Sequence, residues 1–273
     1  ITELLHRTMC IAGMEASIEL AKERGVYPNY YGSLWSKGYL IPDTLKLLKA
    51  NREVYGKDIP DLMEDERYTQ LRADLKQYGI RNGQLFAIAP TASISNFSGT
   101  TQSIEPVYEQ VYVRSNLSGE FISFNRQLVR ILKERNLWTE DTVDEIIDSK
   151  TLKDTSLPLD IKQLCESAFE IDPLILIKHN AIRQGYIDQA ISFNVYQATP
   201  NGRKLLNTYK AAWSHGLKTT YYLRSLSATS LGDKKEPTPS IMEMTKVRIE
   251  TNPLDEVIGK ACLINDPSCE ACQ

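Results

Sequence analysis

The sequence predicts an α/β protein, because strand-like and helix-like segments alternate along much of the chain. Short apolar runs bounded by turn residues, typical of buried strands, lie at 84–89, 190–197 and 218–223. Segments with apolar residues at helical spacing stand between these runs. Strands separated by helices indicate crossover connections within one sheet.

Helices are expected where apolar side chains recur every three or four residues. The first covers residues 2–24 and ends at Gly25. Its expected apolar stripe is Leu4, Leu5, Met9, Ile11, Ala12, Ala16, Ile18 and Leu20. An ordered loop rich in Tyr, Gly and Pro follows at 26–41, and a short apolar stretch lies at 45–48. Further helices are expected at 64–79, 125–136, 140–149, 158–169, 173–185 and 202–215. Predicted core or packing residues are Cys10, Cys165, Trp138 and Trp213.

Composition excludes several classes of protein. The formal net charge of -3 argues against a broad nucleic-acid-binding face, so DNA is not an expected partner. No apolar run approaches the length of a membrane span, and no signal peptide is visible. The five cysteines do not resemble a secreted disulfide framework, which favours the cytoplasm. The chain begins at Ile1 and enters a helical pattern at once, which suggests a fragment, a split-gene product or a processed chain.

The first segment that can carry chemistry directly follows the strand expected at 84–89. It is a polar loop of small residues made of Pro90, Thr91, Ala92, Ser93, Ile94 and Ser95. Such a loop leaves backbone N–H groups open and adds hydroxyl donors, which suits a phosphate, especially if a helix starts there. On the residues alone, a Ser/Thr-rich loop that caps a helix is the commoner explanation.

The second segment is the adjacent pair Tyr221 and Tyr222 at the end of a predicted strand. A tyrosine that loses an electron and its phenolic proton becomes a neutral radical, so two close phenols can pass a radical between them. On the residues alone, β propensity is the commoner explanation for two aromatics on a strand. Adjacent residues on a regular strand point to opposite faces, so stacking of the rings requires an irregular strand end.

The third segment is the C-terminal region, where prolines and mixed charges replace large apolar residues. We expect a domain at 1–231 and a flexible tail at 232–273. The tail ends in Cys269-x-x-Cys272, with Cys262 before it. Such a pair forms a disulfide or binds zinc. Further ligands at suitable spacing are missing, so redox chemistry is favoured over a zinc module and no metal site is predicted.

The position of the dithiol near the end of a tail also favours redox chemistry. About 38 residues separate Leu231 from Cys269. A flexible chain of that length has a root-mean-square span of roughly 35 Å. The dithiol can therefore reach a buried site and withdraw again.

Four motifs occur in a fixed order along the chain. They are Pro90 to Ser95 (PTASIS), Ser103 to Pro106 (SIEP), Leu117 to Phe121 (LSGEF) and Thr220 to Arg224 (TYYLR). Together with segments 31–33, 36–38, 78–82, 188–194 and 216–219 and the tail cysteines, they resemble the large, catalytic subunit of class I ribonucleotide reductases. The resemblance covers nearly the whole chain.

The resemblance implies the C-terminal portion of a ten-stranded α/β barrel with a central finger loop. It also implies an enzyme that reduces ribonucleoside diphosphates to deoxyribonucleoside diphosphates by a radical mechanism. Pro90 to Ser95 would hold the substrate diphosphate, and Tyr221 and Tyr222 would relay a radical from the small subunit. That subunit would carry a dinuclear metal or radical cofactor, and none would be bound by this chain. Cys269 and Cys272 would re-reduce an active-site disulfide, and thioredoxin or glutaredoxin would then reduce the tail.

The family's radical-forming cysteine, its two reducing cysteines and its Asn-x-Cys-x-Glu motif lie upstream of the matched region. No Asn-x-Cys-x-Glu occurs in this chain. The resemblance therefore implies that an N-terminal part of the large subunit supplies the carbon chemistry, through a split gene or because the chain is truncated. One alternative is a non-catalytic assembly or regulatory partner of a complete reductase. Co-purification with the complementary part or with a complete large subunit would separate the two.

A second alternative is a fragment of an adenosylcobalamin-dependent class II reductase. Those enzymes typically have Pro-Thr-Gly-Thr in the phosphate loop and need no tyrosine pair. Thr91-Ala92-Ser93 and Tyr221-Tyr222 therefore favour class I. The helix expected at 202–215 carries an apolar stripe of Leu205, Leu206, Tyr209 and Trp213 that could bind the small subunit's C-terminal tail, although core packing also explains it.

Overall fold

The structure, a computed structural model, describes residues 1–116, 119–149, 151–199 and 201–226. Ile1–Leu226 form one compact unit. The tail predicted at 232–273, with all three of its cysteines, and the boundary predicted after residue 231 lie outside the described residues. No helix in the described part is long and apolar enough to cross a membrane.

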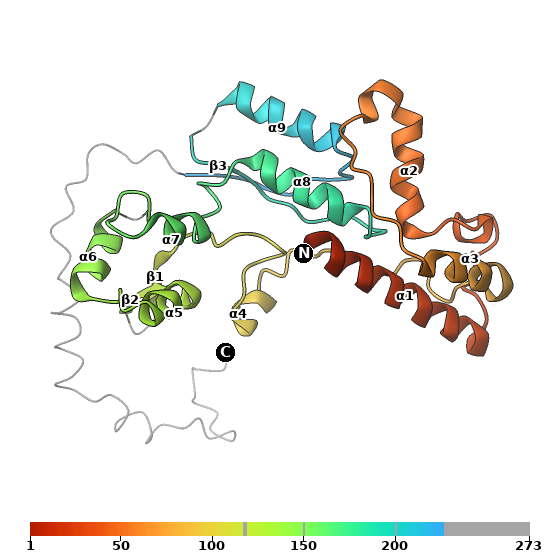
Figure 1. Cartoon of the computed structure of the whole chain (residues 1–273), viewed down its shortest axis with the longest axis horizontal. Helices are drawn as coiled ribbons and strands as arrows, with labels where there is room; N and C mark the ends of the chain where they lie inside the picture. Colours follow the sequence, from red (N-terminus) through yellow and green to blue (C-terminus); the bar gives the residue numbers. More distant parts are fainter. Residues whose placement is uncertain (117–118, 150, 200, 227–273) are drawn as a thin grey trace, which may run out of the picture. The chain divides into compact units, whose positions relative to one another are not determined.

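The described part of the chain is a mixture of helices and strands, and helix and strand alternate only from α8 to β4 (Figure 1). The α-helices are α1 (Thr2–Arg24), α2 (Ile41–Arg52), α3 (Arg67–Tyr78), α4 (Ile94–Ser98), α5 (Arg126–Glu134), α6 (Glu140–Ser149), α7 (Leu159–Leu164), α8 (Pro173–Gln184) and α9 (Gly202–Ser214). Two short 3₁₀ helices are η1 (Trp35–Lys37) and η2 (Glu53–Gly56). The strands are β1 (Val111–Asn116), β2 (Gly119–Phe124), β3 (Val195–Gln197) and β4 (Leu223–Ser225).

The three segments predicted as strands lie side by side in parallel. Ile88 and Ile191 form a parallel bridge, in which the Ser192 N–H donates to the Ile88 carbonyl over 2.9 Å. Farther along the middle segment, β3 pairs in parallel with β4. The regular strands are shorter than predicted, because the first segment leaves the sheet after Ile88 and β4 begins only at Leu223.

Helices α8 and α9 contact each other and cover one face of these strands (Figure 1). Apolar residues of both helices pack with alternate residues of the middle strand. The buried cluster is Ile88, Ile177, Ala181, Ile187, Ile191, Phe193, Val195, Ala212 and Leu217. Because side chains alternate along a strand, Ser192, Asn194 and Tyr196 point to the face that these helices do not cover. That face carries the polar residues described below.

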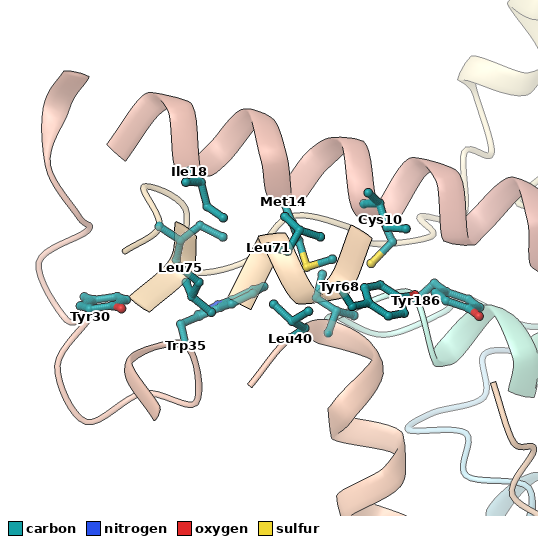
Figure 2. Close-up of a cluster of buried hydrophobic side chains, with 13 residues drawn as sticks. Cys10, Met14, Ile18, Tyr30, Trp35, Leu40, Tyr68, Leu71, Leu75 and Tyr186 are labelled. Atoms are coloured by element: carbon teal, nitrogen blue, oxygen red, sulfur yellow. The ribbon is translucent and has the colours of Figure 1, made fainter. Parts of the chain in front are cut away.

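A second core lies between α1 and α3 (Figure 2). Cys10 is fully buried there beside Met14, Tyr68 and Tyr186, and burial raises the pKa of its thiol to about 12. Its predicted role as a core residue is confirmed. The predicted buried stripe of α1 is largely wrong, since Leu4, Leu5, Met9, Ala12, Ala16 and Leu20 are exposed. The buried face, at 6, 10, 11, 14, 17, 18 and 21, includes two polar positions, His6 and Ser17, that an apolar count overlooks.

A third core joins α5, α6 and α7 to the hairpin of β1 and β2. The hairpin was not predicted. Cys165 is buried in this core, and Trp138 packs edge-on against Phe124 with ring centroids 5.3 Å apart, as expected for packing residues. The helix predicted at 158–169 ends at Leu164, because the chain turns away and the Ala168 N–H donates to the Val107 carbonyl over 2.8 Å.

An ion pair between Asp43 and Arg72 stabilises the junction of α2 and α3. The Arg72 guanidinium donates to both carboxylate oxygens over 2.7 and 2.8 Å, and the Leu40 N–H donates over 2.8 Å. Burial alone would raise the pKa of Asp43, but these donors outweigh it and lower the pKa below its ordinary value of 3.8. The group therefore stabilises the fold above that pH, and its contribution is lost as the pH falls through the lowered pKa.

We expect Asp43→Asn to lower the free energy of unfolding by about 1–3 kcal/mol at neutral pH, a range that allows for the partly exposed Arg72. Urea denaturation at several pH values measures it. The difference from the wild type should shrink as the pH falls below 3.8. The control is Asp61→Asn, which removes a carboxylate of an exposed ion pair with Lys49 and should change stability little. An Asp43→Asn effect that is no larger than the control would contradict the prediction.

Candidate functional site

Tyr221 and Tyr222 lie opposite a single residue, Asn194, where the pairing of the two strands slips by one. The Tyr221 N–H donates to the Phe193 carbonyl over 2.7 Å. The Val195 N–H then donates over 2.8 Å to the carbonyl of Tyr222, whereas an uninterrupted parallel ladder would use that of Tyr221. The extra residue is a β-bulge directly before β4, a feature that redirects side chains.

The bulge brings the two phenol rings together. Their centroids are 4.1 Å apart, with the ring planes inclined at 46°. The irregular strand end that a contact between adjacent rings requires is therefore present, although the rings are tilted and not parallel. Hydrogen bonding to Tyr222, followed by burial, raises the pKa of the Tyr221 phenol above its ordinary value. The Arg224 guanidinium lies over the Tyr222 ring, 4.9 Å from the centroid.

The Glu105 carboxylate contacts the middle strand beside this pair. It accepts from the Asn194 N–H over 2.8 Å, from the Asn194 carboxamide over 3.0 and 3.2 Å, and from the Tyr196 hydroxyl. The carboxamide oxygen of Asn194 in turn accepts from the Tyr222 N–H over 3.3 Å. Burial and the bond to Glu105 raise the pKa of Tyr196. Asn194 thus bridges a carboxylate and the backbone of the tyrosine pair.

The loop predicted to bind phosphate leads into the short helix α4. Ala92, Ser93 and Ile94 are exposed, and in the described part of the chain neither their N–H groups nor the Ser93 hydroxyl finds a partner. Two other loop residues face inward. Thr91 has a positive φ of 52° and its hydroxyl accepts from the Ser103 N–H over 2.8 Å, while Ser95 is buried. The open donors and the helix start are the features that the phosphate prediction required.

Hydrogen bonds connect this loop to the tyrosine pair. The Ser103 N–H donates to the Thr91 hydroxyl over 2.8 Å and to the Pro90 carbonyl over 3.2 Å. At the other end of segment 101–105, Glu105 accepts from Asn194, which accepts from the Tyr222 N–H. Segment 101–105 therefore contacts the loop at Ser103 and the strand at Glu105. The two predicted sites belong to one connected set of residues.

A cavity of about 530 Å³ adjoins the same segment, lined by residues that include Thr100, Ser103, Glu105, His179 and Arg183. The Arg183 guanidinium donates to the Asn180 side chain over 2.7 Å, while its Nε has no partner among the described residues. Burial lowers the pKa of Arg183, and the charge of Glu105 opposes that shift. The cavity therefore places a partly buried cation close to a carboxylate.

The apolar stripe predicted on α9 is partly packed against the core and partly exposed. Leu205 and Tyr209 pack against the core of α8 and the strands, as core packing predicts. Leu206 and Trp213 are exposed at 53% and 49%. Trp213, predicted as a packing residue, does pack, with its ring edge-on to Tyr55 at a centroid distance of 6.2 Å, but outside the buried core. The Arg52 guanidinium also lies over the Trp213 ring, 4.2 Å from its centroid.

Sequence reasoning missed the roles of Glu105, Asn194 and Tyr196. The first lies within the SIEP motif and the second within segment 188–194, so both belonged to matched segments without an assigned function. Their contacts join residues about 90 positions apart, which periodicity cannot reveal. Among the described residues, no group of three or more His, Cys, Asp or Glu side chains could hold a metal ion.

The parallel strands, their covering helices and the connected loop and tyrosine pair define a ribonucleotide reductase barrel domain. The model of the family described as "Ribonucleotide reductase, barrel domain" matches residues 1–223. This chain belongs to the family of ribonucleotide reductase large subunits.

Individual proteins that resemble this chain in sequence or structure are reductase subunits of the same kind. The chain is 47% identical over 218 residues to the ribonucleoside-diphosphate reductase subunit alpha of Chlamydia pneumoniae, covering 79% of this chain and 21% of the relative. It is 36% identical over 232 residues to the ribonucleoside-diphosphate reductase large subunit of Variola virus, covering 84% of this chain and 28% of that relative. The alpha subunit of the Actinobacillus ureae class Id ribonucleotide reductase is structurally similar, with a TM-score of 0.56 and 29% identity over 83% of this chain and 34% of that one. The chain thus spans between a fifth and a third of the length of these relatives.

Proposed function

We propose that this chain works as part of the large subunit of a class I ribonucleoside-diphosphate reductase, in which it relays a radical and holds the substrate diphosphate. The close contact between the rings of Tyr221 and Tyr222 supports this most directly. Each phenol can give up one electron and one proton to become a neutral radical, and the contact between the rings allows the pair to exchange both. The hydrogen bonds through Asn194 and Glu105 support a position of the relay near the substrate.

The loop Pro90 to Ser95 is the proposed diphosphate site. The open N–H groups of residues 92–94 and the Ser93 hydroxyl offer several donors in one short stretch. Hydrogen bonds from backbone N–H groups to anionic oxygens are stronger than those between neutral groups. A ribonucleoside diphosphate presents such oxygens, and the connected segment 101–105 would keep it close to the tyrosine pair.

The remaining steps require partners. We propose that a small subunit, with its own dinuclear metal or radical cofactor, supplies the oxidant that removes an electron from the pair. The N-terminal part of the large subunit would supply the cysteines that act on the ribose. Exposed Leu206 and Trp213 on α9 are candidates for contact with the small subunit, since aromatic residues are frequent anchors of interfaces.

The tail dithiol is the proposed source of reducing equivalents. Each turnover would oxidise two active-site thiols to a disulfide, and Cys269 and Cys272 would reduce that disulfide by exchange while becoming a disulfide themselves. Thioredoxin or glutaredoxin would then reduce the tail.

We expect Ser93→Ala to raise the KM for the ribonucleoside diphosphate about tenfold with little change in kcat, since one hydrogen bond to a charged group is lost. Steady-state kinetics of the reductase assembled with its small subunit measure this. The stability of the variant should be unchanged, because the Ser93 hydroxyl has no internal partner in the described part of the chain. The control is Ser98→Ala, whose hydroxyl bonds within α4. An unchanged KM for Ser93→Ala would contradict the proposed diphosphate site.

A further inference from the structure

We propose that Asn194 and Glu105 are positioning residues, which hold the β-bulge that brings the Tyr221 and Tyr222 rings into contact. This inference rests on the proposed radical relay and adds to it the residues that set its geometry. Neither of them needs to contact the substrate or exchange an electron.

The bulge creates a backbone donor that the strand pairing cannot satisfy. Since Tyr221 and Tyr222 both lie opposite Asn194, the Tyr222 N–H has no carbonyl of the ladder to reach. It donates instead to the carboxamide oxygen of Asn194 over 3.3 Å. An unsatisfied donor would favour return to an uninterrupted ladder, in which adjacent rings point to opposite faces. The Asn194 side chain therefore favours the bulged register over the regular one.

Glu105 determines which way the Asn194 carboxamide is turned. A carboxylate only accepts hydrogen bonds, so the NH₂ group of Asn194 must face Glu105. The carboxamide oxygen then faces the Tyr222 N–H on the other side of the strand. Glu105 is itself fixed by the Asn194 N–H and by the hydroxyl of the buried Tyr196. The negative charge of Glu105 therefore sets the orientation of the Asn194 carboxamide between Glu105 and Tyr222.

Glu105 also replaces a missing strand. The Ser192 N–H finds its acceptor in the Ile88 carbonyl, but the first segment leaves the sheet beyond that point. The next N–H on this edge, that of Asn194, donates to Glu105 over 2.8 Å. One carboxylate thus completes the ladder on one edge of the strand and, through Asn194, supports the bulge on the other.

The test reverses the polarity of the bridge in the complete reductase, with small subunit, ribonucleoside diphosphate and reductant. Asn194→Asp sets two carboxylates against each other, and kcat should fall about 10- to 100-fold while KM for the diphosphate stays unchanged. Glu105→Gln alone keeps an acceptor and should be milder. In the double variant, the new carboxamide at position 105 can donate to the new carboxylate at position 194. The other oxygen of that carboxylate still accepts from the Tyr222 N–H, so kcat should recover to the level of Glu105→Gln.

Asn125→Asp is the matched control, because Asn125 also donates its carboxamide to a side chain and accepts from a backbone N–H, but at the start of α5. It should retain the wild-type kcat. If Asn194→Asp does not fold, Asn194→Ala removes the bridge without adding charge and must lower kcat with KM unchanged. A wild-type kcat in the Asn194 variant, or a double variant no better than Asn194→Asp, would overturn the inference. Tyr222→Phe in the same assay separates the two proposals. If this variant is inactive, the radical relay stands even when the positioning role of Asn194 and Glu105 is refuted. If it is active, the relay itself is wrong.

Discussion

Replacing Tyr222 by Phe is expected to abolish ribonucleotide reduction while leaving nucleotide binding intact. Phenylalanine keeps the ring that contacts Tyr221 at 4.1 Å but has no hydroxyl, so it cannot form a neutral radical by losing an electron and a proton. We expect turnover to fall by about 10³-fold or more, equivalent to roughly 4 kcal/mol in the activation barrier. The assay measures deoxyribonucleotide formed by the reductase with its small subunit, and equilibrium binding of the diphosphate is measured separately.

The control for this variant is Tyr108→Phe. Tyr108 lies near the site, 6.2 Å from the Tyr196 ring centroid, and also loses only its hydroxyl on substitution. Because it does not belong to the tyrosine pair, its variant should turn over at the wild-type rate. Normal turnover of Tyr222→Phe would refute the relay, and equal losses in both variants would indicate a general effect of removing phenols.

The second large effect is expected in the tail. With Cys269→Ser, thioredoxin should no longer support repeated turnover, because the remaining thiol cannot carry two electrons to the active-site disulfide. Product should stop at the amount of reductase present. A small-molecule dithiol that diffuses into the site should still support the reaction.

Cys262→Ser is the matched control, since it removes a thiol from the same tail but leaves the Cys269-x-x-Cys272 pair intact. It should keep thioredoxin-dependent turnover. Full thioredoxin-dependent activity in Cys269→Ser would exclude the proposed role of the dithiol.

Local patterns predicted most of the helices correctly. The helix at 2–24 ends at Gly25, the one at 140–149 has the predicted bounds, and the one beginning at Pro173 ends one residue before the predicted Gly185. Apolar periodicity and helix-stop residues suffice for such elements. The alternation of the three strand segments with helices also predicted correctly that these segments lie side by side.

Other features depend on contacts that a local pattern does not contain. Trp213 packs against Tyr55 and Arg52, which lie far away in the sequence. The hairpin of β1 and β2 packs through Val111 and Phe124 against the core that α5 helps to form. The bulge at the tyrosine pair depends on Asn194, whose orientation depends on Glu105. The sequence alone predicts that contact between the two rings requires an irregular strand end, but it does not identify the residues that stabilise the bulge.

The most direct test of the relay is electron paramagnetic resonance of a reductase that carries, at position 222, a tyrosine analogue easier to oxidise than tyrosine. A hole that passes through this position should be trapped on the analogue. We predict a radical with the hyperfine pattern of the analogue, formed only when small subunit and ribonucleoside diphosphate are both present, as the radical of the small subunit decays. Decay of that radical and formation of product without any signal from position 222 would contradict the account.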